Sequence, residues 1–253
     1  MAREIKPYEE LELKDDFMFG LIMHDSKYVK PFLEMILKIK IRKVVYPQSQ
    51  KSIDLSANAK AIRLDAYVED DQNTVFNLEM QTSDNRNLPK RMRYYQGVID
   101  LNILQKGQDY TKLKKSYVIF ICTFDPFGEG RHIYTFCNTC QENTALTLDD
   151  DAVKIILSTK GTMDDVSPEM KRILDYIDGK GASDKFTEEL EEAVRSARQN
   201  ESWRLGYMTL EYEYRQRYEE GLKEGEETGI AKTNERSIRK LYKRGESIAS
   251  IAE

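Results

Sequence analysis

With 253 residues, of which 40% are apolar and 33% charged, the chain can form one large domain or one domain with an appendage, and its 15 Tyr and 9 Phe exclude a wholly disordered protein. No apolar run has the length of a membrane span, no secretory signal opens the chain, and three Cys cannot all pair, so we expect a cytoplasmic protein without membrane contact. The net charge of −5 does not exclude a nucleic-acid partner, because residues 1–120 carry 20 basic and 17 acidic side chains against 19 and 27 in the remainder.

Apolar periodicity and turn residues predict the elements of the first two thirds of the chain. In chain order they are helices over 17–23 and 28–39, a strand over 41–46, alternating strands over 61–68 and 74–82, a helix over 89–105, and strands over 116–123, 131–137 and 153–157. Asp16 and Ser26 are the expected N-caps of the first two helices. The sequence therefore predicts an α/β fold, a mixed sheet flanked by helices.

The last third of the chain is predicted to be helical and charged. Ser167-Pro168 opens a helix that closes near Gly179, and nearly everything after Thr187 is rich in Glu, Lys and Arg. We expect a core over 1–160 and a helical extension over 161–253. Three glycines, Gly221, Gly225 and Gly229, each cost a helix about 1 kcal/mol. They leave open a flexible tail or the close approach of a partner helix, which would make a homo-oligomer.

The helical pattern at 248–252 is barely more than one turn long. Helix nucleation is costly, so a piece this short does not hold itself together. We expect either a truncated form of a longer protein or disordered last residues.

Two acidic residues face each other across the predicted hairpin. In its second strand Asn77, Glu79 and Gln81 share one face, and Asp65 belongs to the polar face of the first strand. A one-residue slip would place charges on the apolar side, so the pattern favours Asp65 opposite Glu79. The same register places Arg63 opposite Gln81. Opposed residues lie about 5 Å apart, and like charges so placed are destabilising.

The repulsion between these carboxylates leaves two interpretations open. A divalent cation would offset it, because Mg²⁺ takes one or two carboxylates and completes its shell with water and substrate phosphate. Such a site could polarise a phosphodiester and activate a water molecule. In the other interpretation the face is solvated and Arg63 neutralises Glu79 diagonally.

The hairpin and the helix after it resemble a known group of nucleases. Asp65, the Glu79-Met80-Gln81 run and a helix bearing Arg91-Met92-Arg93-Tyr94-Tyr95-Gln96 resemble the PD-(D/E)XK nuclease superfamily. More closely, they resemble the recombination-promoting nuclease/putative transposase (Rpn) family of bacteria. Further matching stretches, within a resemblance over roughly 10–250, are 14–19, 88–91, 122–128 and 220–229. The resemblance implies a restriction-endonuclease-like core that acts on DNA.

The resemblance also implies the roles of four hairpin residues. Asp65 and Glu79 would bind Mg²⁺ or another divalent cation such as Mn²⁺, with the Met80 carbonyl as a third ligand. Gln81 stands where the superfamily has a lysine that orients or activates the attacking water. An amide can hydrogen-bond a water or a phosphate oxygen but carries no charge, so a lysine at this position should serve at least as well.

Three supporting residues follow from the same resemblance. Asp16 matches an acidic position near the first helix, with N-capping as the alternative. Tyr95 and Gln96 are expected at the active site, although one turn of their helix must face the sheet. Gly20 stands where many relatives carry Lys, so we assign no charge there.

Lys90, Arg91 and Arg93 gather in the first turn of the helix over 89–105. The N-terminal amides of a helix also attract anions, so the three could clamp a DNA phosphate beside the metal. A solvated face is the alternative. Cations are mildly unfavourable at a helix N-terminus, which favours a role.

Together these features predict a Mg²⁺-dependent DNA endonuclease that hydrolyses phosphodiester bonds in recombination or transposition. The alternative is a catalytically weak or inactive relative that acts as a DNA- or partner-binding protein, with Gln81 marking the loss. A third hypothesis is a structural oligomer built on the C-terminal helices. We expect no zinc site, because Cys137 and Cys140 supply only half of the ligands that structural zinc needs.

Overall fold

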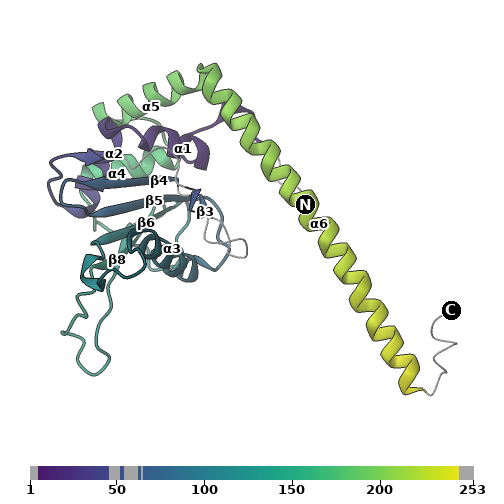
Figure 1. Ribbon diagram of the computed structural model, residues 1–253. Coiled ribbons are helices and arrows are strands. Elements are labelled where there is room, and N and C mark those ends of the chain that lie inside the picture. The colour runs from purple at the N-terminus through teal and green to yellow at the C-terminus, as the bar shows by residue number, and fades with distance from the viewer. Residues whose placement is uncertain (1–4, 46–51, 54–61, 64, 245–253) are drawn as a thin grey trace. The chain divides into compact units, whose positions relative to one another are not determined.

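The computed structural model describes residues 5–45, 52–53, 62–63 and 65–244, and its centre is a six-stranded sheet (Figure 1). The strand order is β1-β4-β5-β6-β8-β7. The strands are β1 (Val44–Val45), β4 (Ala66–Asp70), β5 (Val75–Gln81), β6 (Ser116–Cys122), β7 (Ile133–Phe136) and β8 (Ala152–Ser158). The three central strands β5, β6 and β8 are parallel, whereas β1, β4 and β7 run antiparallel to their neighbours. The predicted mixed sheet is therefore confirmed.

Helices cover both faces of this sheet (Figure 1). On one face lies α3 (Leu88–Ile103), which contacts β6. On the other lie α1 (Asp16–Met23), α2 (Ser26–Leu37), α4 (Pro168–Ile177) and α5 (Lys185–Arg198). Of these, α1 contacts β4 and β5, α4 contacts α2, and α5 contacts α1. Two short 3-10 helices, η1 (Tyr8–Glu10) and η2 (Tyr110–Lys112), complete this part of the chain.

The compact unit that contains the sheet runs from Lys6 to Gln199. It extends past the expected boundary at residue 160, because α4 and α5 bury apolar faces in it. Ile173 and Leu174 of α4 are each 1% exposed, and Leu190 of α5 is fully buried. The physical reason is that an amphipathic helix gains most of its stability from packing that face against a neighbour.

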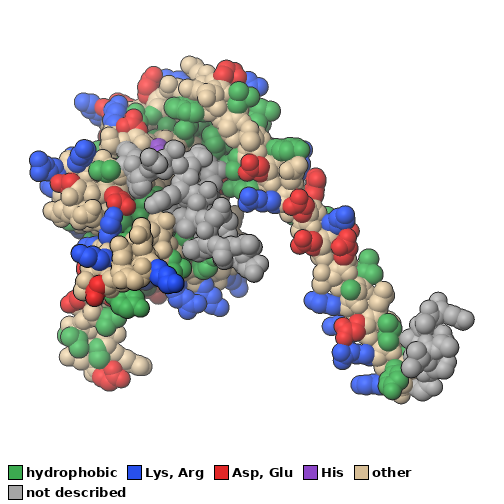
Figure 2. All heavy atoms as spheres, viewed as in Figure 1, with side chains coloured by type: hydrophobic (Ala, Val, Ile, Leu, Met, Phe, Trp, Pro, Cys, Tyr) green, Lys and Arg blue, Asp and Glu red, His purple; other side chains and the backbone are tan. Residues whose placement is uncertain are grey.

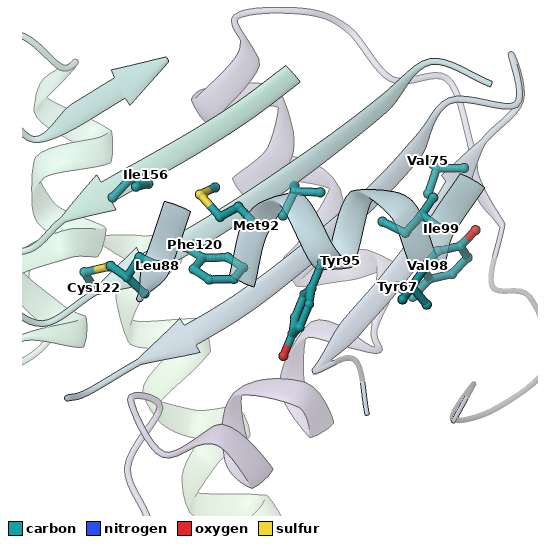
Figure 3. Packing of buried hydrophobic residues seen from close by; sticks show 11 residues of the cluster. Tyr67, Val75, Leu88, Met92, Tyr95, Val98, Ile99, Phe120, Cys122 and Ile156 are labelled. Atoms are coloured by element: carbon teal, nitrogen blue, oxygen red, sulfur yellow. The ribbon is translucent and has the colours of Figure 1, made fainter. Parts of the chain in front are cut away.

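Between α3 and the sheet lies one cluster of apolar side chains (Figure 3). Helix α3 supplies Leu88, Met92, Tyr95, Val98 and Ile99. The strands supply Tyr67, Val75, Val118, Phe120, Cys122 and Ile156. Residues of odd number in β5 share this face, since side chains alternate along a strand. The face that carries Glu79 is therefore the one that α3 covers.

The hairpin of β4 and β5 has the predicted register but a shorter first strand. Ala66 pairs with Leu78 and Tyr67 with Asn77. The expected pairing of Arg63 with Gln81 is wrong, because Arg63 belongs to β3 (Ile62–Arg63) and pairs with Ser52 of β2 (Ser52–Ile53) in a separate sheet. The chain leaves the β4 ladder at Asp65. The Arg63 side chain lies outside the described residues, and so do residues 245–253 with the expected end effects there.

Two of the predicted N-caps are wrong by one residue. The N-cap of α1 is Asp15, and the N-cap of α2 is Asp25, whose carboxylate accepts a hydrogen bond from the Lys27 amide. Aspartate precedes the expected residue in both cases and takes the extended conformation that a cap requires. The prediction for α4 is confirmed, because the Ser167 side chain accepts from the Met170 amide.

Helix α6 (Glu201–Lys243) belongs to a second unit, Asn200–Glu253 with Met1–Ile5. Its N-cap is Asn200, whose side chain accepts from the Trp203 amide. Lys and Arg side chains alternate with Asp and Glu along it (Figure 2). A Cβ added at Gly221, Gly225 or Gly229 would meet no atom of the described residues within 4 Å outside the helix's own backbone, and the predicted homo-oligomer stays a prediction. None of the helices in the described part of the chain is long and apolar enough to cross a membrane.

Candidate active site

The β4–β5 hairpin places Asp65 and Glu79 side by side. The pairing of Ala66 with Leu78 brings the preceding residue, Asp65, opposite Glu79, as the alternation predicts. The Asp65 amide donates to Glu79 Oε1 at 3.3 Å. Asp65 Oδ2 in turn accepts from the Met80 amide at 2.9 Å. The two carboxylates are thus held by backbone groups of one another's strands, at the end of β5.

Glu79 is buried, so the interpretation of a solvated face is wrong. Its exposed fraction is 2%, because α3 covers this side of the sheet. Burial, and then the charge of Asp65, raise the pKa of Glu79 well above its usual value. The Asp65 amide and the Asn77 side chain act in the opposite direction, and so does the charge of Arg91. A buried carboxylate next to a second one favours whatever brings positive charge to the pair.

Gln81, two residues after Glu79, is 7% exposed and hydrogen-bonded at both ends of its amide. Its Oε1 accepts from Arg91 Nη1. Its Nε2 donates to the Met80 carbonyl oxygen at 2.6 Å. That carbonyl was the expected third metal ligand, and in the structure the Gln81 amide already uses one of its lone pairs.

Arg91 and Tyr95 stand one helical turn apart on the face of α3 that meets the sheet. Arg91 Nη2 donates to the Tyr95 hydroxyl at 3.0 Å. The guanidinium carbon lies 5.5 Å from the ring centres of both Tyr95 and Phe120. The Tyr95 ring packs between α3 and the sheet (Figure 3), and burial raises the pKa of its phenol to about 12, with the charge of Glu79 adding to the shift. The hydroxyl therefore stays neutral and accepts from Arg91.

The three basic residues of α3 do not act as one cluster. Lys90 and Arg93 are exposed, whereas Arg91 is half-buried against Gln81. Of the expected clamp, only Arg91 lies at the site. With 3.6 residues per turn, Arg91 is on the sheet side of α3, whereas Lys90 and Arg93 are on its outer side. Contact of Lys90 and Arg93 with DNA stays a prediction.

Gln96 does not join the site. Its Nε2 donates to Ser116 Oγ at 2.8 Å and to Asp100 Oδ1 at 2.9 Å. Ser116 opens β6, while Glu79 pairs with Phe120, four residues further along that strand. At about 3.3 Å per residue, Gln96 lies about 13 Å along the sheet from Glu79.

Asp16 is the first residue of α1, and its Oδ1 accepts from the Phe17 amide at 2.9 Å. It is not the N-cap, which is Asp15. It also forms no metal-binding group with the hairpin carboxylates, because the described residues contain no cluster of three His, Cys, Asp or Glu that could hold a metal ion. The same finding leaves Cys137 and Cys140 without further zinc ligands in this part of the chain. A supporting role for Asp16 stays a prediction.

Two residues to which the sequence assigned no role lie against the site. Gly20 of α1 faces the Asp65 backbone so closely that a Cβ there would stand 2.6 Å from the Asp65 oxygen. A glycine inside a short helix was the signal that could have indicated this approach. Asn77 is fully buried on the Glu79 face. Among the residues that the structure describes, its amide atoms meet no partner with strict hydrogen-bonding geometry, although the amide is close enough to Glu79 to lower its pKa. A polar residue two positions before the glutamate was the corresponding signal.

The architecture and the paired carboxylates agree with one known family. The family described as PD-(D/E)XK nuclease family transposase matches residues 14–160, more than half of the chain and all of the β4–β5–α3 region. No curated protein and no solved structure matches the chain significantly. The core around Asp65 and Glu79 has a restriction-endonuclease-like arrangement, and the chain belongs to the PD-(D/E)XK nuclease family transposases.

Proposed function

We propose that the protein is a divalent-metal-dependent DNA endonuclease that hydrolyses phosphodiester bonds, with a role in recombination or transposition. The observation that carries the proposal is the contact between Asp65 and Glu79, in which a buried glutamate is held next to a second carboxylate. An arrangement of this kind is destabilising in the absence of a cation. The match of this region to a nuclease family supports a catalytic use of the pair.

The donor set fits a divalent cation that prefers oxygen. Asp65 and Glu79 would hold it, and two carboxylates are the number that Mg²⁺ takes from a protein when water and a substrate phosphate complete its shell. Met80 could add its carbonyl oxygen only through the lone pair that Gln81 leaves open, or after Gln81 has rotated away. When bound, such a cation polarises the phosphodiester and lowers the pKa of a water molecule.

The protein's own groups perform the remaining tasks of binding and orientation. Asp65 Oδ2 accepts from the Met80 amide, and this hydrogen bond fixes the position of the carboxylate. The Arg91 guanidinium lies over the ring of Phe120, the β6 residue that pairs with Glu79, and so brings a positive charge beside Glu79. Lys90 and Arg93 stand on the outer side of α3, where contact with DNA phosphates further along the duplex would fix its register.

Nicking of supercoiled plasmid DNA tests this proposal. Wild-type protein is expected to nick with Mg²⁺ or Mn²⁺ and to stop when EDTA is added, while Asp65→Ala and Glu79→Ala are expected to lose at least about 100-fold in rate. Asp71→Ala is the matched control, because Asp71 lies exposed in the turn of the same hairpin. Equal cleavage by both site variants and wild type would exclude this metal site. DNA binding by wild type without any cleavage would favour the alternative of an inactive DNA-binding relative.

A further inference from the structure

We infer that Arg91 is the cationic group that contacts the scissile phosphate, and that Gln81 and Tyr95 are positioning residues that hold its guanidinium in place. The inference rests on the proposed nuclease function. It identifies Arg91 as the side chain that supplies the positive charge at the scissile phosphate. A neutral glutamine two residues after Glu79 is then no deficiency, because the positive charge enters the site from α3.

The side-chain partners of Arg91 are neutral, although its charge also lowers the pKa of Glu79. Within the described part of the chain, the guanidinium donates to Gln81 Oε1 and to the Tyr95 hydroxyl, neither of which is an anion. Within the described residues Arg91 makes no ion pair at 4.0 Å or less, although many other basic side chains of the chain do. A half-buried cation is costly unless an anion pairs with it. The arrangement therefore suits an anionic ligand, and a phosphodiester is the anion that the proposed reaction brings.

The position of the guanidinium is fixed by packing as well as by hydrogen bonds. It lies over the Phe120 ring, and Phe120 is the residue of β6 that pairs with Glu79. It also lies over the Tyr95 ring, one turn along its own helix. Cation–π contact with two rings restrains the guanidinium beside Glu79. The guanidinium donors not used by Gln81 and Tyr95 remain for a substrate.

Gln81 has the geometry of a residue that acts through Arg91. Its Oε1 accepts from Arg91 and its Nε2 donates to the Met80 carbonyl oxygen, so both ends of the side-chain amide are held by protein groups. A lysine here would place a second cation within hydrogen-bonding distance of the guanidinium. Lysine at 81 and arginine at 91 are therefore alternatives, and the chain uses the second.

A charge swap tests this directly. Arg91→Gln is expected to lower kcat by about 100- to 1,000-fold, the cost of removing one donor to developing charge, and to weaken DNA binding through the lost phosphate contact. The sequence alone predicted that a lysine at position 81 would serve at least as well as glutamine. Because Gln81 contacts Arg91 in the structure, Gln81→Lys is instead expected to lower kcat at least tenfold by setting two cations against each other. The double variant Gln81→Lys/Arg91→Gln restores a single cation and is expected to exceed both single variants at least tenfold. A double variant no faster than the slower single variant would overturn the inference, as would full activity in Gln81→Lys.

A second measurement does not depend on cleavage. In EDTA, the logarithm of the DNA association constant falls linearly with the logarithm of salt concentration, with a slope of about −0.9 for each phosphate neutralised. Arg91→Gln is expected to reduce that slope by about 0.9, whereas Arg91→Lys keeps the charge and is expected to keep the slope. An unchanged slope in Arg91→Gln would show that Arg91 does not contact phosphate.

Lys106→Gln is the matched control for both measurements. Lys106 is exposed beyond the far end of α3, so the variant loses one positive charge without touching the site, and its kcat is expected to equal that of wild type. The two proposals fail in different ways. A wild-type protein that cuts no DNA would refute the nuclease, while a reduced salt slope in Arg91→Gln would still show the phosphate contact.

Discussion

Gly20 of α1 lies against the backbone of Asp65, and a Cβ at Gly20 would stand 2.6 Å from the Asp65 carbonyl oxygen. The nearest atoms are backbone, so no side-chain rotation can relieve the contact. Helix α1 thus supports the position at which the chain enters β4 with its first carboxylate. The close approach to the Asp65 backbone gives glycine at position 20 a steric reason.

Gly20→Ala is therefore expected to destabilise the protein and displace Asp65. Overpacking typically costs about 1–3 kcal/mol, against about 1 kcal/mol gained when alanine replaces glycine in a helix. Gly97→Ala in α3 is the control, because a Cβ there would meet nothing within 4 Å and only the gain remains. Urea unfolding of both variants gives the two free energies. A stability gain in Gly20→Ala equal to that in Gly97→Ala would contradict the close approach.

Glu79→Gln is expected to raise the melting temperature of the metal-free protein at pH 8. Burial and Asp65 raise the pKa of Glu79 in the folded state, so its contribution to stability is present below its unfolded pKa and is lost as the pH rises through the folded value. The advantage of the variant should therefore shrink toward pH 4.5, where wild-type Glu79 is protonated. Thermal melts in EDTA across this range measure it, with the exposed Glu129→Gln as control. A constant difference at every pH would argue against a perturbed Glu79.

Asp65→Asn and Asp65→Ala separate the charge of Asp65 from its hydrogen bond. Both variants remove the charge that opposes Glu79, and both are expected to abolish cleavage. Only asparagine keeps an acceptor for the Met80 amide, which Asp65 Oδ2 binds at 2.9 Å. Asp65→Asn is thus expected to be the more stable of the two by about 0.5–1.5 kcal/mol, the net contribution of one hydrogen bond. Denaturant titration without metal checks this, and equal stabilities would mean that the Met80 contact contributes nothing.

Tyr95→Phe and Gln96→Met should have opposite effects although the residues are neighbours. Tyr95→Phe keeps the ring but removes the hydroxyl that accepts from Arg91, so kcat is expected to fall about tenfold, the effect of one lost hydrogen bond to a charged group, with the fold intact. Gln96→Met removes the hydrogen bond to Ser116 at the other end of the sheet. Its kcat is expected to be unchanged, while its free energy of unfolding falls by about 1–3 kcal/mol. Steady-state kinetics and urea unfolding of both variants decide this, and a loss of kcat in Gln96→Met would return Gln96 to the active site.

Local patterns in the sequence determined the hairpin and its register. Alternation over 74–82 assigns Glu79 to a polar face, and a side-chain period of two excludes the one-residue slip that would place Asp65 on the other face. The apolar run at 116–123 likewise predicts the buried central strand that the structure has at β6. Ser167 and Pro168 locate the start of α4 because capping chemistry acts within one turn. These features depend on neighbours in sequence, which is why the sequence reveals them.

Only the tertiary structure decided what covers the Glu79 face and which residues of α3 reach it. Periodicity indicates that some side of a helix is buried but not which face of a sheet receives it, so Lys90, Arg91 and Arg93 could not be told apart. The distance between Gln96 and Glu79 depends on how α3 lies along β6, and the departure of Arg63 from the ladder depends on pairing with Ser52. The contact of Arg91 with Gln81 joins a helix to a strand across a packed interface, and packing between elements is set by the shapes of all their side chains together.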